Sequence, residues 1–194
     1  NHPQIHVHTS TELTQVDGFV GHFTSHLRNG RPGPEGELEL AHGITVLATG
    51  GHELRPTEYL YGQDPRVLTH LELDARFMSE DPSLKRLNSA VFIQCVGSRE
   101  PDRPYCSRVC CSHTMESALE LKQMNPDMKV FVLYRDIRTY GEREALYTQA
   151  RRAGIVFIRY DLERKPFLEP NDRQIAVNLL DPILRSPVVL GADL

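Results

Sequence analysis

The residues of this chain best suited to chemistry are four cysteines that lie close together in one stretch. They are Cys95, Cys106, Cys110 and Cys111, in the run CVGSREPDRPYCSRVCC, and the chain has no others. Four thiolates are what a tetrahedral metal centre or a [4Fe–4S] cluster requires. The stretch is therefore the first candidate for a metal or cluster site.

Three other interpretations of the cysteines stay open on spacing alone. A disulfide between Cys110 and Cys111 would be a strained bridge between neighbours, and nothing in the chain indicates an oxidising compartment. Structural zinc sites usually contain paired C-x2-4-C knuckles, which the C-x10-C-x3-C-C spacing lacks. Four unliganded core thiols are the third alternative. Of these possibilities, we favour the iron–sulfur cluster.

A predicted strand and a predicted helix position the thiols. Residues 90–96 are typical of a buried strand, so Cys95 lies at its carboxyl end, where open α/β sheets bind their ligands. Residues 107–124 are predicted to be a helix, because apolar residues recur near a 3.6-residue period. The periodic positions are Cys111, Met115, Ala118, Leu119 and Leu121. The other three cysteines therefore lie at the start of that helix.

The loop between this strand and helix differs from a dinucleotide-binding turn. Such a turn reads G-x-G-x-x-G and seats a pyrophosphate on the helix N-terminus, whereas residues 97–105 read GSREPDRPY. A cluster with four thiolates is also an anion, so the positive end of the helix dipole would stabilise it at the same place. Arg99, Arg103 and Arg108 add positive charge nearby. We therefore expect a cluster where a dinucleotide-binding unit would hold phosphate.

The rest of the second half alternates strands and helices. Strands are predicted at 129–134 and 155–160, with a helix at 142–153 between them. The order strand–helix–strand–helix–strand implies right-handed parallel crossovers, and hence an α/β fold with a Rossmann-like three-layer unit and a parallel sheet. The tail is predicted to be a β-hairpin with strands at 174–180 and 185–190.

The first half is predicted to be mostly β. Its expected short strands are 5–9, 11–16, 19–27 and 37–41. A hairpin turn is predicted at Asp17-Gly18. The run 43–51, GITVLATGG, is rich in β-branched residues and ends in two glycines, which favours a strand buried on both faces.

A helix and a change of pattern separate the two halves. Residues 69–79 are predicted to be a helix with Thr69 as its N-cap. The pattern changes near residues 82–88, so we expect two domains, 1–88 and 89–194.

Composition excludes several classes of protein. The 194-residue chain is 40% hydrophobic and 25% charged, which is ordinary for a globular protein, and its net charge of −4 argues against non-specific nucleic-acid binding. No apolar run approaches the roughly 20 residues of a membrane span and no signal peptide is visible, so we expect a cytoplasmic protein. The chain begins at Asn1 without a Met, and we expect it to be a piece of a longer protein.

Other polar residues are weaker candidates. The histidines expected to be solvated are His2, His6 and His8. His113 could donate to a cluster sulfide or occupy an ordinary helix position. The residues expected to be loop or docking residues are Arg135, Asp136, Arg138 and Tyr140. No Ser–His–Asp or paired-carboxylate arrangement stands out, so hydrolase chemistry has little support.

The cysteine run and the segments after it carry a family resemblance. VFIQCVGSRE and YCSRVCC, followed by ALELK, NPD, VFVLYRDIRTYGE and AGIVFIRY, resemble the A subunit of heterodisulfide reductase and its relatives. These are flavin and iron–sulfur proteins with a thioredoxin-reductase-like core. The resemblance covers nearly all of the chain and is strongest over residues 89–160.

The resemblance implies a function and a set of site residues. It implies the electron-transfer part of an oxidoreductase that passes electrons between FAD and a [4Fe–4S] cluster, with other iron–sulfur subunits of a complex as partners and a homodimer as a further option. The implied cluster ligands are Cys95, Cys106, Cys110 and Cys111. The implied flavin-contacting residues, from the family's ATG segment, are Ala48, Thr49, Gly50 and Gly51.

The implied fold is that of the pyridine nucleotide-disulfide oxidoreductases, but the chain lacks parts of it. Residues 1–88 would be a β-rich piece of the FAD domain and 89–194 an NAD-domain-type unit. The amino-terminal G-x-G-x-x-G, the carboxyl-terminal return to the FAD domain and ferredoxin-type cysteine motifs are missing. We therefore expect the chain alone to bind FAD weakly and to be inactive. A zinc-stapled interaction module without a redox role and an NAD(P)H-binding reductase domain are the alternatives.

Overall fold

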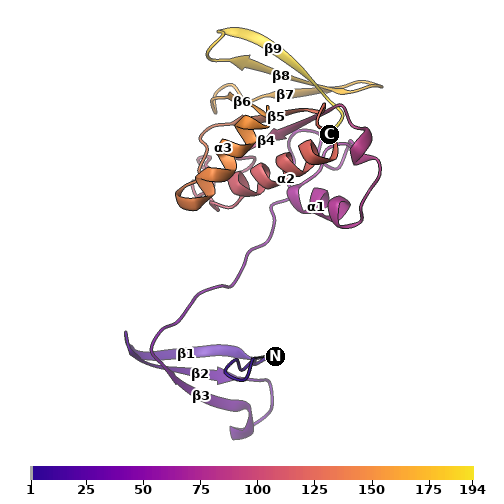
Figure 1. Ribbon diagram of the computed structural model, residues 1–194. Helices are drawn as coiled ribbons and strands as arrows, with labels where there is room; N and C mark the ends of the chain where they lie inside the picture. Colours follow the sequence, from indigo (N-terminus) through magenta and orange to yellow (C-terminus); the bar gives the residue numbers. More distant parts are fainter. Residues whose placement is uncertain (1) are drawn as a thin grey trace. The chain divides into compact units, whose positions relative to one another are not determined.

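The chain forms two compact units. A computed structural model describes residues 2–194, and the chain divides into Asn1–His52 and Glu53–Leu194 (Figure 1). The boundary expected near residue 88 falls inside the second unit, because helix α1 (His70–Met78) packs against helix α2 (Cys110–Met124). The assignment of the two halves to a FAD-type and an NAD-type domain stays a prediction.

The first unit is an antiparallel sheet in the order β1-β2-β3. Its elements are β1 (Glu12–Phe19), β2 (His22–Arg28), the short 3₁₀ helix η1 (Pro34–Gly36) and β3 (Glu37–His42). The predicted hairpin is present, but its turn follows Phe19 instead of lying at Asp17-Gly18. Gly18 pairs with Phe23 inside the ladder. Its φ of 99° favours glycine, and a Cβ atom there would collide with the backbone of His22.

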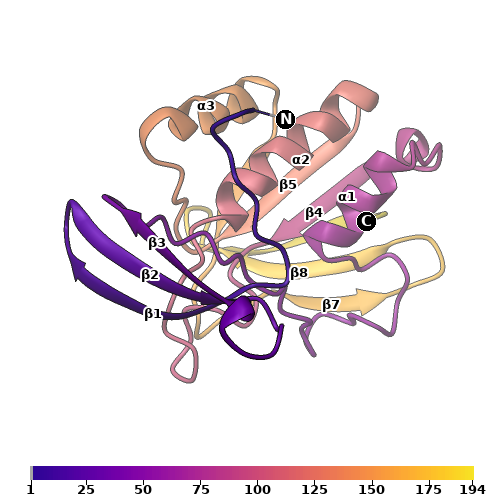
Figure 2. The same cartoon turned by 90° about the horizontal axis from the view of Figure 1, so that it is seen from below.

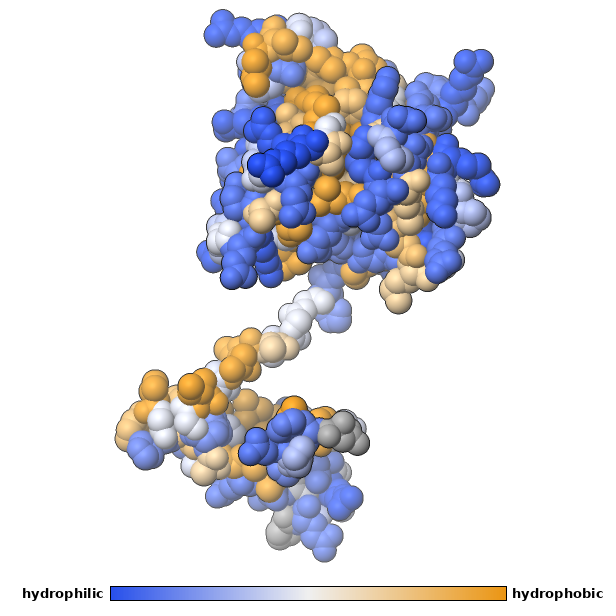
Figure 3. Space-filling view, viewed as in Figure 1, coloured by the Kyte–Doolittle hydropathy of each residue, from blue (hydrophilic) through white to orange (hydrophobic). Residues whose placement is uncertain are grey.

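Two strands predicted for this unit are absent from the described part of the chain. Residues 5–9 and 43–51 form no strand. The run 43–51 was expected to be buried on both faces, but Ile44 is 77% and Leu47 83% exposed, and apolar surface gathers along this segment (Figure 3). Both predictions were wrong because no described strand pairs with these segments. A sequence rich in β-branched residues is suited to a strand, but it forms one only where another strand is available to pair with it.

A parallel sheet forms the centre of the second unit. Strands β4 (Ser89–Ile93), β5 (Lys129–Tyr134) and β6 (Val156–Arg159) pair in the order β4-β5-β6. Helix α2 connects the first two strands. The short helix η3 (Gly141–Arg143) and helix α3 (Glu144–Arg152) connect the second and third. The predicted alternation of strands and helices is confirmed.

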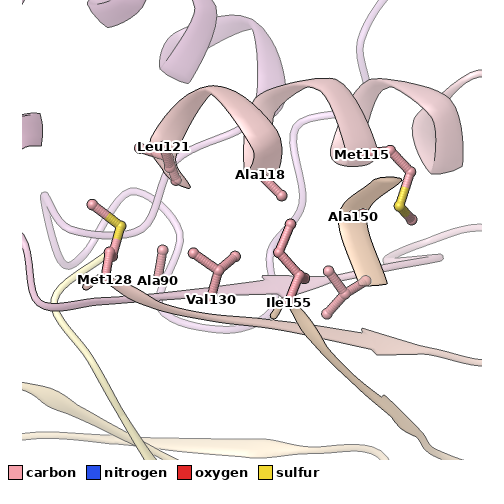
Figure 4. Packing of buried hydrophobic residues seen from close by; sticks show 9 residues of the cluster. Ala90, Met115, Ala118, Leu121, Met128, Val130, Ala150 and Ile155 are labelled. Carbon is pink, nitrogen blue, oxygen red and sulfur yellow. The ribbon is translucent and has the colours of Figure 1, made fainter. Parts of the chain in front are cut away.

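The helices cover one face of this sheet. Figure 2, seen from below relative to Figure 1, shows α2 running along β5, with β4 beside it. In Figure 4, Met115, Ala118 and Leu121 of α2 face the strand residues Ala90 and Val130. All five are at most 1% exposed, so burial of this apolar surface stabilises the unit at roughly 25 cal/mol per Å² removed from water.

The tail covers the opposite face with a second, antiparallel sheet. It consists of β7 (Phe167–Pro170), β8 (Ile175–Asp181) and β9 (Ser186–Ala192). The β8–β9 hairpin was predicted and β7 was not. The buried residues between the two sheets are Leu133, Ile158, Tyr160, Ile175, Val177, Leu179, Leu190 and Ala192. Helices, parallel sheet and antiparallel sheet make three layers, which confirms the predicted α/β class (Figure 1).

Helix α1 begins as its sequence predicts. Thr69 accepts a hydrogen bond from the backbone N–H of Glu72, and the Glu72 carboxylate accepts one from the backbone N–H of Thr69. This capping box satisfies two of the N–H groups that a helix start leaves unpaired. A short 3₁₀ helix, η2 (Leu84–Arg86), follows before β4. His70 lies in this capped first turn, and its ring contacts Thr114 and His113 of α2.

Among residues 2–194, none of the helices combines the length and the apolar character needed to span a bilayer.

Candidate four-cysteine site

Cys95 lies where β4 leaves the parallel sheet. The backbone N–H of Gln94 still donates to the Leu133 carbonyl at 2.9 Å, and the chain turns away at Cys95. This confirms the predicted place of Cys95 at the carboxyl end of the strand. Its φ of 63° is left-handed, which costs a residue with a side chain roughly 1–2 kcal/mol. The surrounding structure must therefore hold this conformation.

Buried Arg135 fixes the loop that follows Cys95. Its guanidinium donates to the carbonyl oxygens of Ser98 at 2.9 Å and Arg99 at 2.8 Å, and the residue is 8% exposed. Gly97 has a φ of 60°, and a Cβ atom there would collide with the side chain of Leu54. Arg135, expected to be a loop or docking residue, thus anchors the loop from inside the fold.

A second anchor ties the same loop to other parts of the unit. Lys165 Nζ lies 2.7 Å from Glu100 Oε1 and 3.0 Å from Glu58 Oε2. Tyr59, close to this group, is partly buried, and this burial raises the pKa of its hydroxyl to about 12. The cysteine loop is therefore held by charged contacts as well as by backbone hydrogen bonds.

Cys106 lies in the loop, ahead of the helix. Helix α2 begins at Cys110, so the helix is shorter at its start than the predicted 107–124. The Cys106 sulfur accepts a hydrogen bond from the backbone N–H of Arg108 at 3.4 Å. Val109, the N-cap residue, has no side chain that can cap the helix. The N–H groups of the first turn are therefore available to acceptors other than a capping side chain.

Cys110 and Cys111 are adjacent in the first turn of α2, and their thiols influence each other's pKa. The Cys111 thiol, then the Ser107 hydroxyl and backbone N–H groups, lower the pKa of Cys110 to about 6 by hydrogen bonding, although burial opposes them. The same thiol–thiol bond, together with burial, raises the pKa of Cys111. Cys111 is 2% exposed, and its sulfur lies 3.9 Å from the Asp136 carbonyl oxygen, which is an alternative acceptor for its single S–H. At neutral pH, Cys110 is therefore the favoured thiolate of the pair.

A cation lies against the strand thiol. Arg99 Nη1 is 3.9 Å from the Cys95 sulfur and Nη2 is 2.5 Å from Asp136 Oδ2. Arg99 is therefore shared between a sulfur and a carboxylate. The predicted positive charge near the thiols is confirmed for Arg99.

All four cysteines are free thiols, on the segment that runs from the end of β4 into the first turn of α2. Cys110 and Cys111 contact each other, and Cys95 is close enough to act electrostatically on the pKa of Cys111. Cys106 makes its hydrogen bond locally, to Arg108. In the described residues, no three His, Cys, Asp or Glu side chains are arranged to hold a metal ion. The donor chemistry nevertheless fits a thiolate-bound group, since hydrogen-bond donors face Cys95, Cys106 and Cys110.

Sequence reasoning missed a buried polar group behind the thiols. The Gln94 amide hydrogen-bonds the Thr114 hydroxyl, which lies 3.1 Å from His70 Nε2. His113 pairs with the Asp74 carboxylate at 2.9 Å instead of with a cysteine. One signal was available: Gln94 is a polar residue directly after the apolar strand run 90–93.

The remaining predicted residues belong to exposed coil of the first unit. Ala48, Thr49, Gly50 and Gly51 are exposed and outside any strand, whereas the cysteines belong to the second unit. His2, His6 and His8 are exposed as well. The predicted flavin contact of the ATG segment stays a prediction.

Fold and site together define a Rossmann-like α/β unit that carries thiols where nucleotide-binding relatives of the fold carry glycines. No family model matches the chain. Curated proteins do. The chain is 33% identical over 174 residues to the A subunit of the H(2)/formate:CoB-CoM heterodisulfide,ferredoxin reductase of Methanococcus maripaludis, covering 81% of this chain and 26% of that protein.

Two further relatives are also A subunits of heterodisulfide reductases. The chain is 33% identical over 177 residues to the iron-sulfur A subunit of the CoB–CoM heterodisulfide reductase of Methanocaldococcus jannaschii, covering 81% of this chain and 26% of that protein. It is 37% identical over 139 residues to the A subunit of the H(2):CoB-CoM heterodisulfide,ferredoxin reductase of Methanothermobacter marburgensis, covering 63% of this chain and 21% of that protein. The chain belongs to the family of heterodisulfide reductase A subunits and their relatives, and it spans about a quarter of the length of these proteins.

Two solved structures show a weaker likeness. One is an ornithine N-hydroxylase of Kutzneria sp. 744, with a TM-score of 0.47 and 12% identity over 95% of this chain and 52% of that one. The other is an L-lysine 6-monooxygenase of Pseudomonas syringae, with a TM-score of 0.48 and 15% identity over 94% and 51%. Neither bears on function at this similarity.

Proposed function

We propose that the chain is the electron-transfer part of a flavin- and iron–sulfur-dependent oxidoreductase similar to the A subunit of heterodisulfide reductase. In this proposal, a [4Fe–4S] cluster is held by Cys95, Cys106, Cys110 and Cys111. The observation that carries it is that three of these sulfurs have hydrogen-bond donors directed at them, from Arg99, from the backbone of Arg108 and from the first turn of α2.

Thiols must lose their protons before they bind a metal, and the surroundings of Cys110 favour this deprotonation. The pKa of Cys110 is lowered to about 6, so this sulfur needs little free energy to become a ligand at neutral pH. The partner thiol of Cys111 has a raised pKa because it donates to Cys110. Removal of that proton requires a positive group in its place, and a metal ion supplies one.

The residues around the sulfurs would then adjust the properties of the bound group. A bound [4Fe–4S] cluster supplies one-electron transfer at a potential that hydrogen bonds to sulfur and nearby charge determine. Arg99 holds its charge at Cys95, and Asp136 on its other side fixes its direction. The first turn of α2, with its positive dipole end, supports negative charge at Cys110 and Cys111.

The flavin and the partners complete the proposal. Ala48, Thr49, Gly50 and Gly51 would run along FAD, where glycines allow close approach of the backbone. The relatives are named as subunits, and one is named as an iron-sulfur subunit, which supports other iron–sulfur subunits as partners. We also propose a cytoplasmic location, as expected from the sequence.

Anaerobic reconstitution tests the cluster. The chain is incubated with iron and sulfide, and metal content and the low-temperature EPR spectrum of the reduced protein are measured. About four iron and four sulfide per chain with the spectrum of a reduced [4Fe–4S] centre are expected. Near-stoichiometric zinc without iron would contradict the proposal and favour a zinc-stapled module.

A further inference from the structure

A chain of buried polar side chains lies behind the cysteines. The Gln94 amide hydrogen-bonds the Thr114 hydroxyl, which lies 3.1 Å from Nε2 of His70. Gln94 is 2% exposed and Thr114 is fully buried. Polar groups lose hydration when they are buried, and apolar side chains of the same size would fill these positions without needing partners. Packing alone therefore does not account for them.

Gln94 is held from three directions. Its backbone N–H donates to the Leu133 carbonyl at 2.9 Å, and its carbonyl accepts from the Tyr160 hydroxyl at 2.5 Å. Its side chain reaches Thr114 on α2. These bonds tie the residue to β5, to the chain directly after β6 and to the helix. Because the next residue is Cys95, they fix the point from which its left-handed turn starts.

Thr114 connects Gln94, and through it the start of the Cys95 turn, to the helix that carries Cys110 and Cys111. It lies three residues after Cys111 and four after Cys110, so it shares their side of α2. Its hydroxyl can accept from the Gln94 amide and donate to His70, which uses its single donor. Burial, followed by the charge of His113, lowers the pKa of His70 to about 4, so the ring is neutral at pH 7 and Nε2 can accept.

The His70 ring is itself fixed. It stacks on Phe92 of β4 at 5.9 Å between centroids and on His113 of α2 at 4.7 Å. His113 in turn pairs with Asp74 of α1. The hydroxyl of Thr114 therefore lies between an amide and an imidazole that both have little freedom to move.

We propose that Gln94, Thr114 and His70 are positioning residues that set the separation between the strand thiol and the helix thiols. The inference rests on the proposed function, since the separation matters only when Cys95, Cys110 and Cys111 must bind one group. Ligands of a metal group have to be held within about 0.5 Å of their working geometry, and outer residues do this. The Gln94–Thr114 bond is a direct bridge between the two elements that carry these thiols.

Two substitutions at one position test the bridge. Thr114→Val removes the hydroxyl and keeps the shape, whereas Thr114→Ser keeps the hydroxyl. Ser117→Ala is the matched control, because Ser117 is 2% exposed on the same helix but donates only within it, to the His113 carbonyl at 3.0 Å. Gln94→Met is a second test of the same bond from the strand side. Circular dichroism melting establishes that each variant is folded.

One readout needs no cluster. The metal-free chain is treated with a short bifunctional thiol reagent, dibromobimane, and the yield of cross-link from Cys95 to Cys110 or Cys111 is measured by peptide mapping. We expect Thr114→Val and Gln94→Met to lower this yield about fivefold, the ratio expected for loss of one hydrogen bond. Thr114→Ser and Ser117→Ala are expected to stay near the unsubstituted chain.

The second readout is the reconstituted chain, by iron content and EPR line shape. Altered line shape and lower iron in Thr114→Val, with recovery in Thr114→Ser, are expected. Folded Thr114→Val and Gln94→Met variants with unchanged cross-linking and spectra would overturn the inference. An unsubstituted chain that binds no iron would overturn the proposed function instead, and the cross-linking result would still decide whether the bridge positions the thiols.

Discussion

The guanidinium of Arg99 lies 3.9 Å from the sulfur of Cys95, four residues earlier in the chain, while its other nitrogen bonds Asp136 at 2.5 Å. Both Cys95 and Arg99 have left-handed backbone conformations, with φ of 63° and 59°. The loop thus turns back on itself so that a cation meets the thiol. This relationship gives the most direct test of how the chain would adjust a bound cluster.

Replacing Arg99 by Gln should lower the reduction potential of the reconstituted chain. The reduced cluster carries one more negative charge, which the guanidinium stabilises more than it stabilises the oxidised state. A loss of about 1 kcal/mol corresponds to roughly 40 mV for one electron. The measurement is a redox titration followed by EPR. Arg152→Gln, which removes the same charge from an exposed position on α3, is the control and should leave the potential unchanged. Equal changes in the reduction potential of both variants would show that the position of Arg99 beside Cys95 does not matter.

Replacing Cys106 or Cys110 by Ser should each remove most of the reconstituted iron. An alcohol is a much poorer ligand than a thiolate, so we expect apparent iron affinity to fall about tenfold or more. Both side chains are partly exposed, so the folded state should tolerate the change, and thermal melting checks this. Tyr105→Phe is the control, because it changes a 67% exposed side chain of the same loop without removing a thiol. Full iron binding by the Cys106 variant would exclude that residue from the ligand set.

Replacing Gly97 by Ala should destabilise the second unit by about 1–2 kcal/mol. The backbone there has a φ of 60°, and the new methyl group would collide with Leu54. Gly154→Ala is the matched control, because its φ of 80° carries the same backbone cost but no atom lies within 4 Å of the added carbon. Urea unfolding should therefore show a larger loss for Gly97→Ala. Equal losses would mean that Leu54 moves aside freely.

The stabilising contribution of His70 should decline in mild acid. Its pKa is lowered from 6.5 to about 4, so the folded chain binds this proton less readily than the unfolded chain. The contribution is therefore complete above pH 6.5 and is lost as pH falls toward 4, by about 3 kcal/mol. The measurement is the difference in unfolding free energy between the unsubstituted chain and His70→Asn. This difference should shrink from pH 7 to pH 4, whereas for His8→Asn, at an exposed position, it should stay near zero. A difference for His70→Asn that is constant with pH would contradict a partly buried imidazole that is neutral in the folded chain.

Local rules predicted much of the second unit. The capping box at Thr69 and the alternation of strands and helices depend on near neighbours in sequence, and both are present. The place of Cys95 at the strand end followed from the same alternation. The three predicted or implied groups at the sheet end, thiols, arginine and helix start, are also there.

Features that depend on distant partners could not be predicted. The run 43–51 has the composition of a buried strand, but burial requires a neighbour that the described residues do not provide. The bond between Gln94 and Thr114 joins residues twenty positions apart, so no local pattern reports it. The buried role of Arg135 likewise depends on the path of a loop nearly forty residues earlier.

The left-handed backbone at Cys95 lowers the stability of the fold, whereas its thiol is needed for the proposed cluster. Glycine is the residue that adopts a φ of 63° without strain, so a cysteine there makes the metal-free chain less stable than it could be, by roughly 1 kcal/mol. Selection for stability alone would favour removal of the thiol. Under the proposed function, position 95 is thus one at which a more stable chain would lose a cluster ligand.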